Sequence, residues 1–225
     1  MALQLTLNNV GKSYNFDWIF RGLTLDLQNG QSVAVLGGNG SGKSTFLKIV
    51  AGSSYVSEGT IDYTHNGKKV DKDKVYSLVS LCAPYQLLFD DFTLAESIAF
   101  QGKFKPFVNN ISQKEIIDLI ELPKVANKAL KYYSSGMKQR AKLALAILAD
   151  TPVLLLDEPG TNLDKKGLSG LKTCCYHKCK TVWCLYALTA TMKNRASAQP
   201  LWRLSSTRRR LFSRLISFFN LELCI

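Results

Sequence analysis

Long apolar runs are absent from this 225-residue sequence, and histidines are scarce. No stretch reaches the roughly 18 to 20 apolar residues that a membrane-spanning helix needs. The N-terminal segment MALQLTLNNV alternates like a strand and lacks the charged start and long apolar run of a secretory signal. The sequence therefore predicts no membrane span and favours a cytosolic chain, in which the six cysteines stay reduced. Only His65 and His177 offer an imidazole for catalysis or metal binding.

Acidic residues are nearly missing from the last part of the chain, although the whole chain carries a net charge of +12. Residues 1–167 hold 19 Lys and Arg against 16 Asp and Glu, a net charge of +3. Residues 168–225 hold 10 Lys and Arg against one acid, a net charge of +9. Five of the six cysteines also lie there: Cys174, Cys175, Cys179, Cys184 and Cys224. Two regions of different composition therefore meet near residue 168.

The segment GGNGSGKST, residues 37–45, fits the phosphate-binding pattern G-x-x-x-x-G-K-[ST]. An apolar strand over residues 32–36 precedes it, and a helix is predicted from Lys43 onward. Glycines let successive N–H groups face one anion, and the helix start adds further unpaired N–H groups. We predict that Lys43 reaches the β- and γ-phosphates and that the Ser44 hydroxyl ligates Mg²⁺. The predicted nucleotide-binding residues of the loop are Gly37, Gly38, Asn39, Gly40, Ser41, Gly42, Lys43, Ser44 and Thr45.

The remaining pattern predicts an α/β fold. Apolar alternation and turn signals predict strands over residues 4–7, 23–27, 60–64, 75–82, 153–158 and 181–189. Residues 86–134 read as mainly helical, with capping-box spacings at Thr93 to Glu96 and Ser112 to Glu115. A longer helix is predicted to begin at Gly136.

The strand VLLLDE, residues 153–158, ends in two carboxylates. Ligands of open α/β sheets lie at the carboxyl ends of the strands, so both groups are expected at a ligand site. Asp157 is predicted to hold Mg²⁺ through a water, and Glu158 to orient and polarise the attacking water as general base. A turn that merely ends a strand is the alternative, and the phosphate-binding loop upstream argues against it.

Together these motifs resemble the nucleotide-binding subunit of ATP-binding cassette (ABC) transporters over residues 1 to about 167. The segment YYSSGMKQR resembles the family's signature loop, with Ser134, Ser135 and Gly136 in its central positions. Tyr133, Ser135 and Met137 depart from the commonest leucine, glycine and glutamine. A serine and a glycine before a helix N-terminus still suit a γ-phosphate.

The resemblance implies a P-loop NTPase core with an antiparallel β subdomain and a helical signature subdomain at about residues 87–135. It also implies a head-to-tail dimer, because the signature loop of one subunit completes the ATP site of the other. Gln86 matches the glutamine that joins the core to the helical subdomain and senses Mg²⁺ and the attacking water. Tyr14 resembles the aromatic residue that stacks on adenine, with Phe16 and Trp18 near enough to compete. Asp164 resembles the aspartate that couples the two sites.

The implied function is an ATP-hydrolysing subunit that binds ATP and Mg²⁺ and drives a membrane-spanning transporter subunit. Its expected partners are that subunit and a second nucleotide-binding subunit, and no nucleic acid is expected. The expected location is the cytoplasm, peripheral on the inner face of the cell membrane. One alternative is a soluble ABC protein acting on ribosomes or DNA, although such proteins usually carry two cassettes or long inserts. A second is a protein that binds ATP with little or no hydrolysis.

The family pattern then stops, because the expected histidine is missing. It should follow the strand over residues 181–189 and contact the γ-phosphate, but Ala190, Thr191 and Met192 follow instead. His177 precedes that strand, and His65 lies in the turn-like segment HNGKK, so neither suits this role. We therefore expect a chain that is less stable and slower at hydrolysis than a complete cassette.

Four hypotheses address residues 168–225. A shifted reading frame would explain the change in composition, the missing histidine and the missing strands together. Residues 208–219 could instead form a basic amphipathic helix on an acidic membrane surface. The cysteines, with His177, could bind metal, although paired C-x₂-C units are absent. The arginine run could bind nucleic acid. We predict that residues 192–207 are poorly ordered and that residues 208–219 form at most a loosely attached helix.

Overall fold

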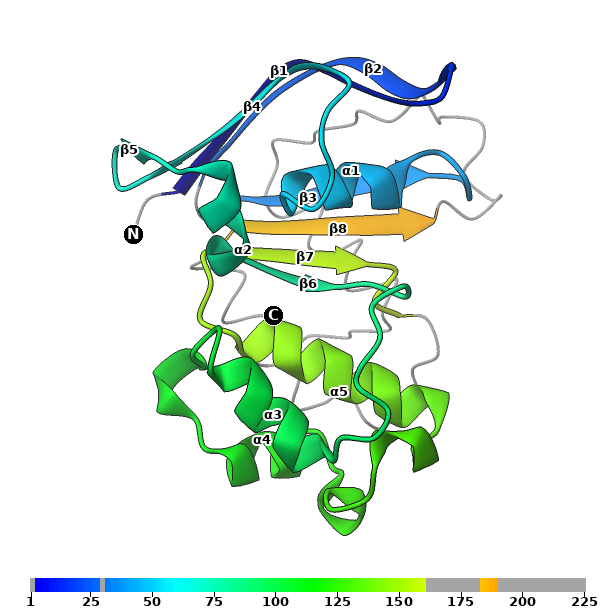
Figure 1. Cartoon of the computed structure of the whole chain (residues 1–225), viewed down its shortest axis with the longest axis vertical. Helices are drawn as coiled ribbons and strands as arrows, with labels where there is room; N and C mark the ends of the chain where they lie inside the picture. Colours follow the sequence, from blue (N-terminus) through cyan, green and yellow to red (C-terminus); the bar gives the residue numbers. More distant parts are fainter. Residues whose placement is uncertain (1–2, 29–30, 161–182, 190–225) are drawn as a thin grey trace, which may run out of the picture.

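The computed structural model describes residues 3–28, 31–160 and 183–189. Its strands are β1 (Leu3–Tyr14), β2 (Asp17–Gln28), β3 (Ser32–Gly37), β4 (Glu58–His65), β5 (Lys68–Lys69), β6 (Val79–Cys82), β7 (Val153–Asp157) and β8 (Trp183–Thr189). Its α-helices are α1 (Lys43–Val50), α2 (Val75–Leu78), α3 (Leu94–Gly102), α4 (Gln113–Leu119) and α5 (Ser135–Leu148). An antiparallel sheet, a parallel sheet and a helical layer are stacked in that order (Figure 1).

The antiparallel sheet has the strand order β2-β1-β4-β5. Its two longest strands pair in register over most of their length, with irregularities around Val10. The predicted strands at residues 4–7 and 23–27 are therefore confirmed but longer than predicted. Asn66 and Gly67 both adopt positive φ, of 51° and 76°, and form the tight turn between β4 and β5. His65 is the last residue of β4, directly before this turn, and is only partly exposed.

The parallel sheet has the order β3-β8-β7-β6 and forms the core. Its middle strands are covered on both faces, which explains their continuous apolar sequences. Leu154 and Leu156 pack with the helical layer, whereas Val153 and Leu155 pack with α1 and the antiparallel sheet. The predicted strand at residues 181–189 is confirmed over Trp183–Thr189, where it lies between β3 and β7.

Two sequence-based assignments need correction. Residues 75–82 were predicted as one strand, but α2 occupies the first four positions and only Val79–Cys82 form a strand. Val75 is fully buried against Gly52, so tertiary packing outweighs its β propensity. Residues 86–134 contain two α-helices and several short 3₁₀ turns, and the segment from Gln86 to Asp91 is a loop.

The helices α3 and α4 of the helical layer begin directly after the caps that the sequence predicts. Thr93 and Ser112 each accept a hydrogen bond from the backbone N–H of the glutamate three residues later. Each glutamate side chain in turn accepts from the cap's own backbone N–H, which completes both capping boxes. The longer helix, α5, begins at Ser135 with Ser134 as its cap, one residue earlier than predicted.

Several predictions fall outside the described residues: the role of Asp164, the position of His177, and the structure of residues 190–225. The proposed cysteine cluster also lies there, apart from Cys184, which is buried in β8. Within the described ranges, no three His, Cys, Asp or Glu side chains come together as a metal site. Among the same residues, no helix is long and apolar enough to cross a membrane.

The burial of β8 predicts a large loss of stability for Leu185→Ala. Leu185 is fully buried opposite Leu155, and truncating such a residue typically costs about 2–5 kcal/mol in the free energy of unfolding. Denaturant unfolding of the purified chain measures it. Leu87→Ala, at a side chain that is 91% exposed, is the matched control. If Leu185→Ala lowers the free energy of unfolding as little as Leu87→Ala does, the central position of β8 would be contradicted.

Candidate functional site

The loop between β3 and α1 is shaped by two glycines whose backbone or surroundings exclude a side chain. Gly42 caps α1 with φ 89°, and a Cβ there would collide with Ile19. A Cβ at Gly37 would collide with the Ser41 hydroxyl. The loop residues Gly38, Asn39 and Gly40 are exposed at the tip. The loop therefore presents its backbone to solvent at the start of a helix, which suits an anion.

Lys43, the first residue of α1, lies beneath this loop. The residue is only 5% exposed, and its Nζ donates to the carbonyl oxygens of Gly37 at 3.1 Å and Gly38 at 2.9 Å. These two bonds hold the ammonium group against the loop, where it can meet a phosphate. Ser44 and Thr45 follow on the first turn of α1 and are partly exposed.

Asp157 ends β7, beside this loop, with an exposure of 1%. Among the described residues, no hydrogen bond of good geometry reaches either carboxylate oxygen, although the Ser44 hydroxyl lies close enough to interact. Burial raises its pKa, and nearby Glu158 adds to this, whereas the Ser44 hydroxyl and, more weakly, Lys43 lower it. A buried carboxylate beside a hydroxyl, with no other side-chain donor aimed at it, is a donor set that fits Mg²⁺.

Glu158 has an unusual backbone. Its φ of 45° lies in the left-handed region, which is uncommon for a residue with a side chain and is further disfavoured before proline. The Glu158 N–H donates to the carbonyl oxygen of Ala187 at 3.0 Å, so β8 holds it in place. Such strain gathers at functional sites, where the surrounding structure fixes it.

The signature segment begins α5. Ser134 accepts a hydrogen bond from the Met137 N–H at 3.3 Å, while Ser134 and Ser135 are exposed and Gly136 is partly exposed. Further along α5, buried Gln139 donates from Nε2 to the carbonyl oxygen of Pro159 at 3.3 Å. The helix that carries the signature segment thus contacts the chain directly after Glu158. Sequence reasoning missed this glutamine.

The three N-terminal aromatic residues have different surroundings. Tyr14 is 47% exposed, with the Lys12 ammonium 4.8 Å from its ring centre. Trp18 stacks with Arg21, whose guanidinium carbon lies 4.2 Å from the ring centre, and Phe16 is 98% exposed. All three therefore present ring surface to solvent near the start of β2.

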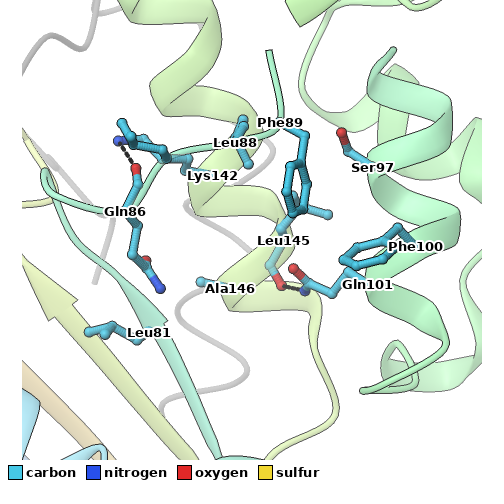
Figure 2. Close-up of a pocket in the computed structure, with 11 residues that line it drawn as sticks. Leu81, Gln86, Leu88, Phe89, Ser97, Phe100, Gln101, Lys142, Leu145 and Ala146 are labelled. Carbon is cyan, nitrogen blue, oxygen red and sulfur yellow. Dashed lines mark hydrogen bonds between the residues drawn. The ribbon is translucent and has the colours of Figure 1, made fainter. Parts of the chain in front are cut away.

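Gln86 lies in a loop that also borders a groove between the parallel sheet and the helical layer (Figure 2). Its Oε1 accepts from the Ala83 N–H at 3.1 Å, which turns the side chain back onto its own loop. Lys142 of α5 donates to the carbonyl oxygens of Ala83 at 3.4 Å and Gln86 at 3.3 Å. Figure 2 shows the Gln86 side chain directed toward Leu81 and Ala146.

Tyr85, the neighbour of Gln86, was not singled out from the sequence. The Lys48 ammonium of α1 lies 4.2 Å from its ring centre. The side chain is 40% exposed, and the burial of the rest of it, together with the Asp157 carboxylate, raises the pKa of the Tyr85 phenol to about 12. Its position three residues after β6 was the available signal, because such positions fall at the carboxyl edge of the sheet.

The parallel sheet, the glycine loop and the two carboxylates at one sheet edge define a P-loop nucleotide-binding domain. A model of the ABC transporter family matches residues 20–161, and the chain belongs to this family. The chain therefore contains the ATP-binding domain of that family.

Curated relatives agree with this assignment. The chain is 34% identical over 169 residues to human ATP-binding cassette sub-family A member 10, covering 71% of this chain and 11% of that protein. It is 32% identical over 171 residues to the sulfate/thiosulfate import ATP-binding protein CysA of Halalkalibacterium halodurans, and the match covers 73% of this chain and 48% of that protein. The chain therefore spans about a tenth of the first relative's length and about half of the second's.

Solved structures share the fold. The structure described as an ATP binding subunit of an ABC transporter matches with a TM-score of 0.71 at 20% identity, covering 98% of this chain and 95% of the other. A bacterial Atm1-family ABC exporter with ATP bound matches with a TM-score of 0.67 at 20% identity, and the match covers 84% of this chain and 35% of the other. The predicted α/β fold, with its P-loop core, antiparallel sheet and helical layer, is confirmed.

Proposed function

We propose that this chain is an ATP-binding and ATP-hydrolysing subunit of an ABC transporter. The main support for this proposal is that the glycine loop, buried Lys43 and the adjacent carboxylates Asp157 and Glu158 lie together at one edge of the parallel sheet. In this proposal residues 1–167 form the ATPase domain, with a helical subdomain at about residues 87–135. The chain's share of its curated relatives' length is small, so transport by the whole assembly belongs to the proposal.

The proposed reaction is in-line attack of water on the γ-phosphate. The loop amides and Lys43 would bind the phosphates, and the ammonium charge would offset charge that develops in the transition state. Glu158 would hold the attacking water and accept its proton at a carboxylate oxygen. Tyr14 would stack on the adenine, and the exposure of its ring supports this role.

Magnesium is proposed to be held by Ser44 and, through a water, by Asp157. The burial of the Asp157 carboxylate and its closeness to the Ser44 hydroxyl support this donor set. When bound, the ion would neutralise phosphate charge. Gln86 is proposed to respond to the ion and the water and to link the loop after β6 with the helical subdomain.

A head-to-tail dimer is proposed to complete each site. Ser134, Ser135 and Gly136 are accessible at the N-terminus of α5, a 14-residue helix, and this accessibility supports contact with a γ-phosphate held by the second subunit. Asp164 is proposed to couple the two sites. The second subunit could be identical to this chain or different from it.

The groove in Figure 2 is the proposed contact for the membrane-spanning partner. Phe89 and Phe104 beside it are each 59% exposed and form a ring cluster with Phe100, at centroid distances of 5.5 Å and 5.2 Å from it. Exposed aromatic rings gathered at a concave surface are typical of protein interfaces. Because Gln86 borders the same groove, a partner seated there could influence the catalytic edge. In this proposal the chain lies in the cytoplasm, at the inner face of the membrane.

One observation favours a second function, in which ATP is bound without turnover. The residues directly after β8, Ala190 to Met192, include no histidine to contact the γ-phosphate. Titration of a fluorescent ATP analogue and phosphate release, measured side by side on the purified chain, separate the two functions. Saturable binding with steady phosphate release is the expected result. Binding without release would support the second function, and absence of binding would contradict both.

A further inference from the structure

Residues 83–86 form a small turn whose two end residues bond to each other and to Lys142. The Gln86 N–H donates to the Ala83 carbonyl oxygen at 3.1 Å, and the Ala83 N–H donates to Gln86 Oε1 at 3.1 Å. Lys142 donates to the carbonyl oxygens of both residues. The Ala83 and Pro84 side chains carry no polar group. Among the side chains of this turn, the remaining polar groups are the Tyr85 hydroxyl and Gln86 Nε2, and Figure 2 shows the Gln86 amide directed toward Leu81 and Ala146. Tyr85 is therefore the side chain of this turn that we consider for a ligand at the sheet edge.

The sheet register brings this turn to the candidate site. In the parallel pair of β6 and β7, Cys82 lies opposite Leu156, so the residues after Cys82 run alongside Asp157. The Tyr85 ring also lies against Lys48, one and a half turns along α1 from Lys43. Lys48 lowers the pKa of the Asp157 carboxyl, and the Asp157 charge in turn raises the pKa of the Tyr85 phenol. Tyr85 is thus held between α1 and the end of β7.

We propose that the Tyr85 hydroxyl belongs to the magnesium site, where it donates a hydrogen bond to a magnesium-bound water beside Asp157. Gln86 is folded back onto its own turn, and its side chain is directed toward Leu81 and Ala146. The ring contact with Lys48 orients the phenol, and the Lys142 bonds fix the turn to α5. This inference rests on the proposed function, because it needs ATP and Mg²⁺ at the site.

The test uses Tyr85→Phe, which keeps the ring against Lys48 and removes only the hydroxyl. Affinity for a fluorescent ATP analogue is measured twice, with excess EDTA and with excess Mg²⁺. We expect the affinity in EDTA to stay at the parent value and the gain produced by Mg²⁺ to fall about tenfold, the usual scale for a hydrogen bond to a charged group. Tyr76→Phe, at a 60% exposed tyrosine on α2 before the opposite end of β6, is the matched control and should match the parent in both.

Two results would overturn the inference. If Mg²⁺ raises the ATP affinity of Tyr85→Phe as much as that of the parent, the hydroxyl does not contact the magnesium-bound water. An equal loss of affinity in EDTA and in Mg²⁺ would show that the phenol supports the fold or the nucleotide itself. If the parent chain binds no ATP at all, the proposed function fails. If the parent binds ATP and Tyr85→Phe has the same affinity as the parent in EDTA and in Mg²⁺, the inference alone fails.

Discussion

Lys43→Ala is expected to lower the affinity for ATP about 10- to 100-fold and to abolish measurable hydrolysis. The substitution removes the cation that the structure holds beneath the glycine loop by bonds to Gly37 and Gly38. A hydrogen bond to a charged group contributes about 1.5–3 kcal/mol, which corresponds to this range of affinity. Titration of a fluorescent ATP analogue and a phosphate-release assay measure the two effects.

Folding and binding must be separated here, because the Lys43 side chain is buried. Lys43→Met keeps most of the apolar stem, so it should retain the parent's thermal stability while losing ATP binding. Lys72→Ala, at an exposed lysine before α2, should behave as the parent in every assay. Parent-like binding and turnover in both Lys43 variants would mean that this loop is not the phosphate site.

Glu158→Gln is expected to reduce hydrolysis about 10²- to 10⁴-fold while ATP binding persists. Glutamine keeps the size and hydrogen-bonding reach of glutamate but removes the charge that polarises water and accepts its proton, and general-base catalysis is worth about that factor. With hydrolysis blocked, ATP should hold two chains together across the signature segment. Size-exclusion chromatography with light scattering in saturating ATP, with magnesium withheld, measures the dimer.

The matched control is Glu121→Gln. Glu121 is exposed after α4 and shares the positive φ of Glu158, at 57°, so the exchange tests the same chemical change on a similar backbone. It should leave hydrolysis at the parent rate. A monomeric Glu158→Gln in saturating ATP would contradict the head-to-tail dimer, and undiminished phosphate release would remove Glu158 from the role of general base.

The sequence by itself determined the elements whose reasons are local. The glycine pattern and Lys43 specified the loop between β3 and α1, since only glycine fits the φ of Gly42 beside Ile19. The capping boxes at Thr93 and Ser112 specified two helix starts, because cap and glutamate lie one turn apart. Continuous apolar residues specified β7 and β8 as strands covered on both faces.

Only the tertiary structure decided the features that depend on residues far apart in the chain. Val75 begins a helix because it packs against Gly52, a contact that no short window of sequence reveals. Gln86 turns onto its own loop and toward the groove, because Ala83 and Lys142 hold the turn in place. The sequence identified the glutamine by resemblance, but side-chain direction is set by these bonds.

The same reason applies to Tyr85 and Gln139. Tyr85 belongs to no motif, and Gln139 lies in the signature segment without a role assigned from the sequence. Each acquires its place from a neighbour on another element: Lys48 of α1 for Tyr85, and the Pro159 carbonyl for Gln139. Motifs record what the chain repeats locally, whereas the parallel pairing of β6, β7 and β8 brings together strand ends that lie up to about a hundred residues apart. That pairing decides which side chains share the edge of the sheet with Asp157.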